Sequence, residues 1–398
     1  MINFSEEVRT VNQFHYTAWP DHGTPGAIEL NQFHRTVTKS CQPGQPLLVH
    51  CSAGVGRTGT YIGLNVLLQK GREKGRINVF EFVKQMREDR MTMVQTVEQY
   101  VFLHKALLCG FQERGVILSE RDLQAKVLTL LNDTSPFNQQ TLTNEFQIVS
   151  AFKAVDEDGS KENANKLENR SKNVDMDILP VSKYRPYLTT YVKGRNDYIN
   201  AVIAPTFTNQ NGFIMTQKPL LDTEVDLWRL CMDHGVTAIV VLNDSDEENN
   251  WLPNRGETRH CQPFTVTAKN TGSDINGVLQ DSLLISKNNQ KAHVDIYQTP
   301  SGNDEALVKC AKMLLQKDNA STSSSLVVSK NGAGPAGIFC ILHNAIQQLS
   351  IDGEVDILTR VRQIQTRRPE VITTLEEYRK CYHLVSRSVS SEEIYVNF

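Results

Sequence analysis

The sequence predicts an α/β (α+β) fold made of two copies of one domain, the first of them incomplete. The chain has 398 residues, which exceeds the roughly 250–300 residues at which single cores stop growing. One stretch of sequence recurs later in the chain at a constant spacing. Each copy also runs from a short apolar strand through a glycine-rich turn into a helix, which is typical of α/β folds.

The repeat aligns residues 48–100 with residues 326–378 without a gap, at an offset of 278. Arg90 falls on Arg368, and four glycines of the first copy fall on glycines of the second. The matched glycines are Gly54, Gly56, Gly59 and Gly75 in the first copy and Gly332, Gly334, Gly337 and Gly353 in the second. A long shared register of this kind indicates an internal duplication.

The first copy begins with an apolar run at residues 46–49, which predicts a strand. The apolar spacing through residues 61–68 then predicts a helix on the far side of the glycine-rich turn. Two further helices are predicted around residues 79–87 and 97–108. Thr96 suits the start of the second of these helices.

The second copy has a long front section with strand patterns at residues 197–201, 213–217 and 236–242. Subtracting the offset of 278 from these numbers gives negative positions. We therefore expect the first domain to be truncated at its N-terminus, with Met1 starting inside a domain.

The region between the copies predicts a helix over residues 115–132 and a polar, mobile surface stretch over residues 156–173. The resulting division is an incomplete first domain at 1–114, an inter-domain helix and linker at 115–140, and a second domain at 141–398.

Composition excludes several classes of partner. The net charge of −3, from 42 basic and 45 acidic residues, argues against a broad nucleic-acid surface. No apolar run approaches the ~18 residues needed to span a bilayer, so direct membrane insertion by this chain is not expected. The eight cysteines stand singly, without a CxxC pair, which indicates a reducing compartment and no structural zinc.

The segment from Val49 to Gly59 predicts a site that binds phosphate. Cys51 is followed by five residues and then Arg57, between a predicted strand and a predicted helix. Glycines let successive backbone N–H groups turn inward and form an anion nest at the positive end of the helix dipole. This field also favours a thiolate, so Cys51 is the candidate nucleophile, with a lowered pKa.

The remaining residues of this loop complete the predicted cradle. Arg57 offers a planar fork suited to two phosphate oxygens, and the Thr58 hydroxyl is placed to donate to the sulfur. The candidate phosphate-binding residues are Ser52, Ala53, Gly54, Val55, Gly56, Arg57 and Thr58.

Two other phosphate motifs compete for this segment. Gly54, Gly56 and Gly59 also satisfy the GxGxxG dinucleotide fingerprint, but that motif expects a second strand ending in an acidic residue about 20 positions on. Here a long helical pattern follows instead, and the fingerprint gives Cys51 no role. A Walker-type loop needs a GK[ST] sequence, which the segment lacks.

Two further segments supply candidate catalytic groups. Trp19-Pro20-Asp21 lies in a loop rich in proline and glycine, so Asp21 is the candidate proton donor and Trp19 the anchor about which the loop closes. Downstream, Gln95 and Gln99 stand at the start of a predicted helix, and a neutral carboxamide can position a water that hydrolyses a cysteinyl phosphate.

These motifs resemble those of the classical protein tyrosine phosphatases. The segment His50–Gly59 matches their cysteine loop, Trp19-Pro20-Asp21 looks like their mobile acid loop, and Gln95 with Gln99 resembles their glutamine loop. The duplication resembles the tandem cytoplasmic domains of receptor-type members, and the sequence around Ser171 looks closest to the kappa/mu/T group. The resemblance implies two tandem cysteine-phosphatase domains, each with a twisted central mixed sheet flanked by helices.

The same resemblance implies phosphotyrosine hydrolysis through a phosphocysteine intermediate, without a metal or cofactor. Its implied partners are phosphotyrosine-containing proteins and, within or between molecules, the inactive second domain. Its implied location is cytoplasmic, as the intracellular part of a single-pass membrane receptor.

The second copy lacks the groups that this chemistry needs. At the offset of 278, Cys51 becomes Ser329, and a serine without a base to ionise it is a poor nucleophile. Three further functional side chains are replaced in the second copy: Arg57 by Pro335, Thr58 by Ala336 and Gln95 by Thr373. In addition, Ser171 stands where the family places a recognition tyrosine. We expect the turn shape to survive and the affinity for phosphate to be lost.

Three functions stay open on the sequence. The first is a tyrosine phosphatase whose first domain is catalytic and whose second is regulatory. The second is a catalytically inactive binding or scaffold module, because the truncated first domain exposes apolar sheet edges. The third is a dual-specificity phosphatase, which the tandem pattern and the Trp-Pro-Asp context disfavour.

Overall fold

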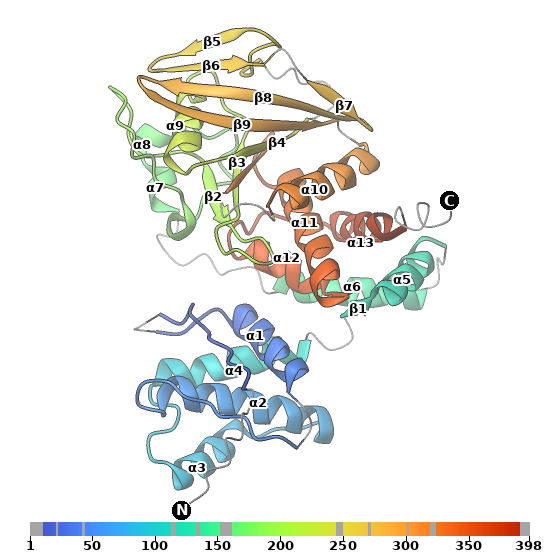
Figure 1. Cartoon of the computed structure of the whole chain (residues 1–398). Coiled ribbons are helices and arrows are strands. Elements are labelled where there is room, and N and C mark those ends of the chain that lie inside the picture. The colour runs from blue at the N-terminus through green and yellow to red at the C-terminus, as the bar shows by residue number, and fades with distance from the viewer. Residues whose placement is uncertain are drawn as a thin grey trace, which may run out of the picture. The chain divides into compact units, whose positions relative to one another are not determined.

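A computed structural model describes residues 11–20, 23–41, 44–112, 117–132, 136–151, 161–243, 250–269, 272–300, 302–318 and 324–390. The contacts divide the chain into two compact units, Met1–Arg114 (unit 1) and Gly115–Phe398 (unit 2). Figure 1 shows their helices and strands, which are labelled where there is room. No helix in these described ranges is both long enough and apolar enough to cross a membrane.

The described residues of unit 1 form four helices and no strand. The helices are α1 (Ala27–Ser40), α2 (Gly56–Lys74), α3 (Val79–Asp89) and α4 (Val97–Gln112). Helices α1 and α2 both pack against α4, and Leu64, Leu68 and Leu103 are fully buried between them. The helices predicted from the apolar spacing in this unit are confirmed.

The predicted strand at residues 46–49 is wrong, because this segment has no regular structure and leaves Leu48 88% exposed. Its counterpart in the second copy is strand β10 (Ser325–Ser329), in which Leu326 is fully buried. Strand β10 is hydrogen-bonded on both sides. A strand needs a neighbour to satisfy its backbone groups, and the described part of unit 1 offers none.

Unit 2 contains a mixed sheet of nine strands in its described residues. The strands are β2 (Ala201–Ala204), β3 (Phe213–Gln217), β4 (Ala238–Leu242), β5 (Thr258–Cys261), β6 (Phe264–Ala268), β7 (Ser273–Ile275), β8 (Val278–Lys287), β9 (Gln290–Thr299) and β10. Their order is β2-β3-β10-β4-β9-β8-β6-β5, with β7 paired to β8. The four strands β3, β10, β4 and β9 run parallel, and the outer strands are antiparallel. The predicted mixed sheet flanked by helices is therefore confirmed for unit 2.

Helices cover both faces of this sheet. The helices of unit 2 are α5 (Glu120–Asn132), α6 (Pro136–Ala151), α7 (Glu162–Asn165), α8 (Leu167–Arg170), α9 (Glu224–Asp233), α10 (Asp304–Asp318), α11 (Gly334–Asp352), α12 (Ile357–Gln365) and α13 (Leu375–Ser390), and a short ladder joins β1 (Leu118–Ser119) to β11 (Glu354–Val355). Val327 packs into the core shared with α10, α11 and α13, whereas Leu326 and Val328 pack into the core shared with α9. This alternation follows from the two-residue period of a strand.

The strand predicted at residues 197–201 begins later, at Ala201. The preceding side chains form hydrogen bonds instead: the Tyr198 hydroxyl donates to Asn173 Oδ1 at 2.5 Å, and Asn200 Nδ2 donates to Ile178 O at 2.9 Å. These contacts tie the residues before β2 to the segment around α8. The strands predicted at 213–217 and 236–242 are confirmed as β3 and β4.

The polar stretch predicted to be mobile surface at residues 156–173 lies largely at the surface in its described part, residues 161–173, but four of its residues are buried. Asn169, within α8, is 3% exposed, and Asn173, three residues after the end of α8, is 8% exposed. Asn173 Nδ2 donates to the carbonyl oxygen of Asn169 at 3.0 Å. Buried amide side chains are stable when hydrogen-bonded, so low apolar content did not prevent burial here. Residues 156–160 lie outside the described ranges.

The duplication is visible in the geometry of both units. Helices α2 and α11 begin and end at positions separated by 278 residues. Gly54 and Gly332 have φ angles of 70° and 74°, and Val94 and Ile372 have φ angles of 56° and 54°. A positive φ is costly for β-branched residues, so its presence at the same place in both copies marks a shared tight turn.

Candidate active site

The glycine-rich loop before α2 holds the sulfur of Cys51 at its centre. Gly54 adopts a positive φ of 70°, which only glycine adopts readily, and α2 begins two residues later at Gly56. The Gly54 N–H and the Thr58 hydroxyl donate to Cys51 Sγ at 3.3 and 3.1 Å. The loop therefore curls around the sulfur at the N-terminus of a 19-residue helix.

Two opposing effects act on the pKa of Cys51. Burial raises the pKa, whereas the Thr58 hydroxyl and the backbone N–H groups of Thr58, Gly54 and Val55 lower it. The hydrogen bonds prevail, and the pKa of Cys51 lies below its ordinary value. The sulfur is only partly buried, so it is ionisable and within reach of a substrate.

The structure brings Arg57 to the segment that carries the candidate acid. Arg57 Nη2 donates to the carbonyl oxygen of Pro20 at 3.1 Å. Trp19 is 8% exposed, packs its ring 6.0 Å from that of Phe102, and donates from Nε1 to Gly23 O at 3.3 Å. Trp19 thus anchors this segment on α4, while Asp21 lies outside the described residues.

The two glutamines lie beside the glycine-rich loop. A Cβ added at Gly56 would stand 3.0 Å from Gln99 Nε2 and 3.2 Å from Gln95 Oε1. Gln99 Oε1 also accepts from the backbone N–H of Gln95 at 2.9 Å, so its side chain caps the start of α4. Both amides therefore face the loop that contains Cys51.

Sequence reasoning missed two arginines at this site. Arg90 Nη2 donates to the carbonyl oxygen of Ala53 at 3.0 Å and so holds the outer side of the loop. Arg87 donates to the carbonyl oxygens of Met93 and Val94. The match of Arg90 with Arg368 in the repeat was a usable signal for the first, whereas no sequence signal pointed to the second.

In unit 2, the equivalent loop keeps its shape and loses its polar groups. Ser329 is 2% exposed, and its hydroxyl has no hydrogen-bond partner within the described part of the chain. Pro335, the second residue of α11, stands in place of Arg57, and Ala336 brings no hydroxyl. Glu377 replaces Gln99, and its Oε1 would stand 3.2 Å from a Cβ added at Gly334. A carboxylate at this place disfavours a bound anion.

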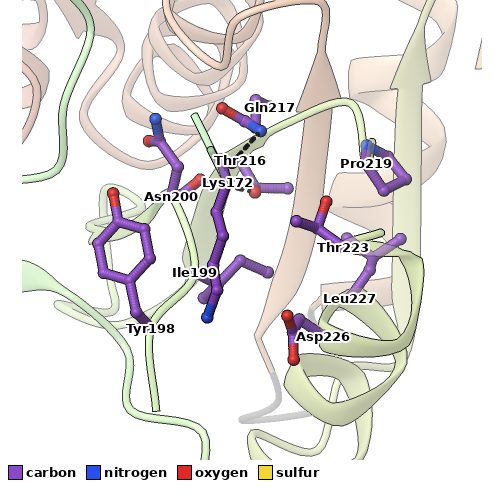
Figure 2. Close-up of a pocket in the computed structure, with 10 residues that line it drawn as sticks. All are labelled: Lys172, Tyr198, Ile199, Asn200, Thr216, Gln217, Pro219, Thr223, Asp226 and Leu227. Atoms are coloured by element: carbon purple, nitrogen blue, oxygen red, sulfur yellow. Dashed lines mark hydrogen bonds between the residues drawn. The ribbon is translucent and has the colours of Figure 1, made fainter. Parts of the chain in front are cut away.

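Near Ser171, unit 2 has a small pocket between the start of β2, the end of β3 and α9 (Figure 2). Burial is the main cause that lowers the pKa of Lys172 there. Gln217 Nε2 donates to the carbonyl oxygen of Lys172 at 2.9 Å. Asp226 is paired with Arg195 and Arg229, each at 2.8 Å. The carboxylate of Asp226 is therefore neutralised within the protein, which indicates a structural network.

The fold and the cysteine loop together define the class of protein. The family model for protein-tyrosine phosphatase matches residues 2–109 and 169–387, and the chain belongs to this family.

Among curated proteins, the chain is 32% identical over 402 residues to receptor-type tyrosine-protein phosphatase zeta of Rattus norvegicus. This alignment covers 97% of the chain and 17% of that protein. The chain is 31% identical to receptor-type tyrosine-protein phosphatase U of Gallus gallus, in an alignment that covers 96% of the chain and 28% of that protein. The chain is 28% identical to receptor-type tyrosine-protein phosphatase alpha of Homo sapiens, in an alignment that covers 98% of the chain and 50% of that protein. The chain thus spans half or less of each of these relatives, and particular similarity to the kappa/mu/T group stays a prediction.

Proposed function

We propose that this chain hydrolyses phosphotyrosine in proteins through a phosphocysteine intermediate formed in unit 1. The observation that carries the proposal is the sulfur of Cys51, which accepts hydrogen bonds from Gly54 N and Thr58 Oγ1 at the start of α2. Such a thiolate is a strong nucleophile, and the surrounding amides suit the oxygens of a phosphate.

The reaction proceeds in two steps. The Cys51 thiolate attacks phosphorus, the bond from phosphorus to the tyrosine oxygen breaks, and Asp21 gives its proton to the departing oxygen. Arg57 and the loop amides neutralise the charge on the phosphoryl oxygens. Water held by Gln95 then attacks phosphorus, Asp21 takes its proton, and the bond from sulfur to phosphorus breaks, which releases phosphate and restores the thiolate.

Two roles are proposed for the remaining residues of the site. Trp19 and Gln99 position the acid loop and the glutamine loop, because each side chain is itself anchored by a hydrogen bond to backbone. The backbone N–H groups of residues 52–58 bind the phosphoryl oxygens.

For the whole chain, we propose a catalytic domain part at 1–114, a connecting segment at 115–140 and a degenerate regulatory domain at 141–398. The carboxylate of Glu377 and the loss of the arginine at Pro335 support an inactive second domain. The receptor-type relatives support a place in the intracellular part of a single-pass membrane receptor, with phosphotyrosine proteins and the second domain as partners.

Turnover of p-nitrophenyl phosphate by the full chain tests this proposal. Cys51→Ser should lower the rate by at least about 10³-fold, because the nucleophile is lost. Ser329→Ala is the matched control in the second copy and should leave the rate unchanged. Equal rates for the native chain and Cys51→Ser would contradict the proposal.

The same assay separates the competing functions. Absence of turnover in the native chain would favour a binding or scaffold module, an alternative supported by the exposed Leu48 segment. Phosphoserine and phosphotyrosine peptides tested in parallel distinguish a dual-specificity enzyme, which would cleave both.

A further inference from the structure

The turn at residues 93–94 links α3 to the glycine-rich loop. Val94 is fully buried and has a φ of 56°, an unfavourable conformation for a β-branched residue. Its N–H donates to the carbonyl oxygen of Val55 at 3.2 Å, so the turn is attached directly to the loop around Cys51. The next residue along the chain is Gln95, and the direction of its side chain depends on this turn.

Arg87 holds the other side of the same turn. Its Nε donates to Met93 O at 2.9 Å, and its Nη2 donates to Val94 O at 2.8 Å. A strained turn persists only where surrounding contacts hold it. The two hydrogen bonds from one planar guanidinium fix the orientation of both carbonyls.

The second copy shows that this arrangement is maintained with a different side chain. Residue 365 stands at the position of Arg87, and it is glutamine. Gln365 Nε2 donates to Val371 O at 2.9 Å and to Ile372 O at 3.4 Å, the same two carbonyls at the offset of 278. Two unlike side chains therefore make the same pair of contacts to a turn with the same positive φ.

The turn also meets α2 closely. A Cβ added at Gly59 would stand 2.6 Å from the backbone nitrogen of Val94, so the two backbones are packed with no intervening side chain. Gln95 directly follows this turn in the chain. A displacement of the turn would therefore move Gln95 relative to the loop that contains Cys51.

We propose that Arg87 is a positioning residue for Gln95: it fixes the turn at residues 93–94 through its two carbonyls and so sets the place of the glutamine amide beside Cys51. This inference rests on the proposed function for its catalytic consequence. The positioning itself does not depend on turnover.

Hydrogen exchange of the full chain tests the positioning. Arg87→Met keeps an unbranched, flexible side chain but removes every donor, and it should speed exchange of the amides of residues 93–96 about tenfold. Arg87→Gln should restore near-native exchange, as glutamine serves in the second copy. Lys84→Met, on the exposed face of the same helix, is the matched control and should change nothing at the turn. Native exchange rates at residues 93–96 in Arg87→Met would overturn the inference.

A second variant covers the case in which Arg87→Met unfolds unit 1, which fast exchange throughout α4 would reveal. Gln365→Met is nearly isosteric and removes the same two contacts within the larger core of unit 2. It should speed exchange at residues 371–374 while the sheet stays protected. Unchanged exchange there would equally overturn the inference.

Turnover kinetics test the catalytic consequence separately. A shift of about 1 Å in a catalytic group costs up to ~10²-fold, so Arg87→Met should lower kcat roughly 10- to 100-fold. The initial burst of p-nitrophenol should be retained, because Gln95 serves the second step. Equal loss of burst rate and kcat would contradict a role through Gln95. If the native chain shows no turnover, the proposed function fails, and the exchange experiment alone decides the role of Arg87.

Discussion

At the residue scale, the behaviour of this protein centres on the ionisation of one thiol. The pKa of Cys51 lies below its ordinary value, because hydrogen bonds from the Thr58 hydroxyl and three backbone N–H groups lower it by more than burial raises it. The buried cysteines behave in the opposite way: burial raises the pKa of Cys231, Cys310, Cys340 and Cys381. Among these five thiols, only that of Cys51 has a pKa that its surroundings lower, which favours the reactive thiolate.

Thr58→Val should raise the pKa of Cys51, because it removes the hydroxyl donor at 3.1 Å and keeps the side-chain shape. The depressed pKa keeps the thiolate populated as the pH falls, so the variant should need a higher pH for the same rate of alkylation. The pH profile of iodoacetamide labelling at Cys51, resolved by mass spectrometry, gives this measurement. The Cys51 profile of Thr60→Val, two residues further along α2, serves as the control. A profile for Thr58→Val that coincides with the native one would show that the hydroxyl does not stabilise the thiolate.

At the element scale, the same sequence pattern occurs in two copies with different surroundings. Helices α2 and α11 form over matched residues because their apolar faces find neighbouring helices in both units. The strand pattern before them forms β10 in unit 2 only, where β3 and β4 lie on either side. Helices satisfy their backbone groups internally, whereas a strand depends on its neighbours.

This difference predicts unequal costs for matched substitutions. Leu326→Ala should destabilise unit 2 by about 2–5 kcal/mol, because it opens a cavity in a closed core. Leu48→Ala should change the stability of unit 1 by less than about 0.5 kcal/mol, because the side chain is 88% exposed. Urea unfolding followed by tryptophan fluorescence measures both, since Trp19 reports on unit 1 and Trp228 and Trp251 report on unit 2. Similar costs at the two positions would show that Leu48 is buried in solution.

At the scale of the whole molecule, the chain between the two copies belongs structurally to unit 2. Helices α5 and α6 pack on α13, and a buried polar cluster joins them. Lys126 Nζ contacts Glu145 Oε1 at 2.6 Å, and the Tyr382 hydroxyl donates to Glu145 Oε2 at 2.8 Å. Tyr378 donates to the same oxygen at 3.2 Å. One carboxylate therefore ties three helices together.

Glu145→Ala should destabilise unit 2 by roughly 3–5 kcal/mol, because Lys126 would keep its charge in a largely buried place without a counter-charge. The double variant Lys126→Met/Glu145→Leu should recover most of this loss, since no uncompensated charge remains. Urea unfolding followed by the fluorescence of Trp228 and Trp251 gives the measurement. A single variant as stable as the native chain would mean that the α5–α6 segment does not depend on this cluster.

The sequence alone determined the parts of this protein that are set by local contacts. The cysteine loop could be predicted because Cys51, Gly54 and Thr58 interact within eight consecutive residues and need only a glycine turn and a helix start. The duplication and the helices were equally readable, since their apolar spacing does not depend on distant residues.

Only the tertiary structure decided which of these patterns found partners. It left Leu48 exposed, buried Asn169 and Asn173, and placed Arg87 against the turn beside Gln95. The physical reason is the same in each case: burial, strand pairing and the satisfaction of backbone carbonyls are properties of contacts between segments, and no single segment encodes its neighbours.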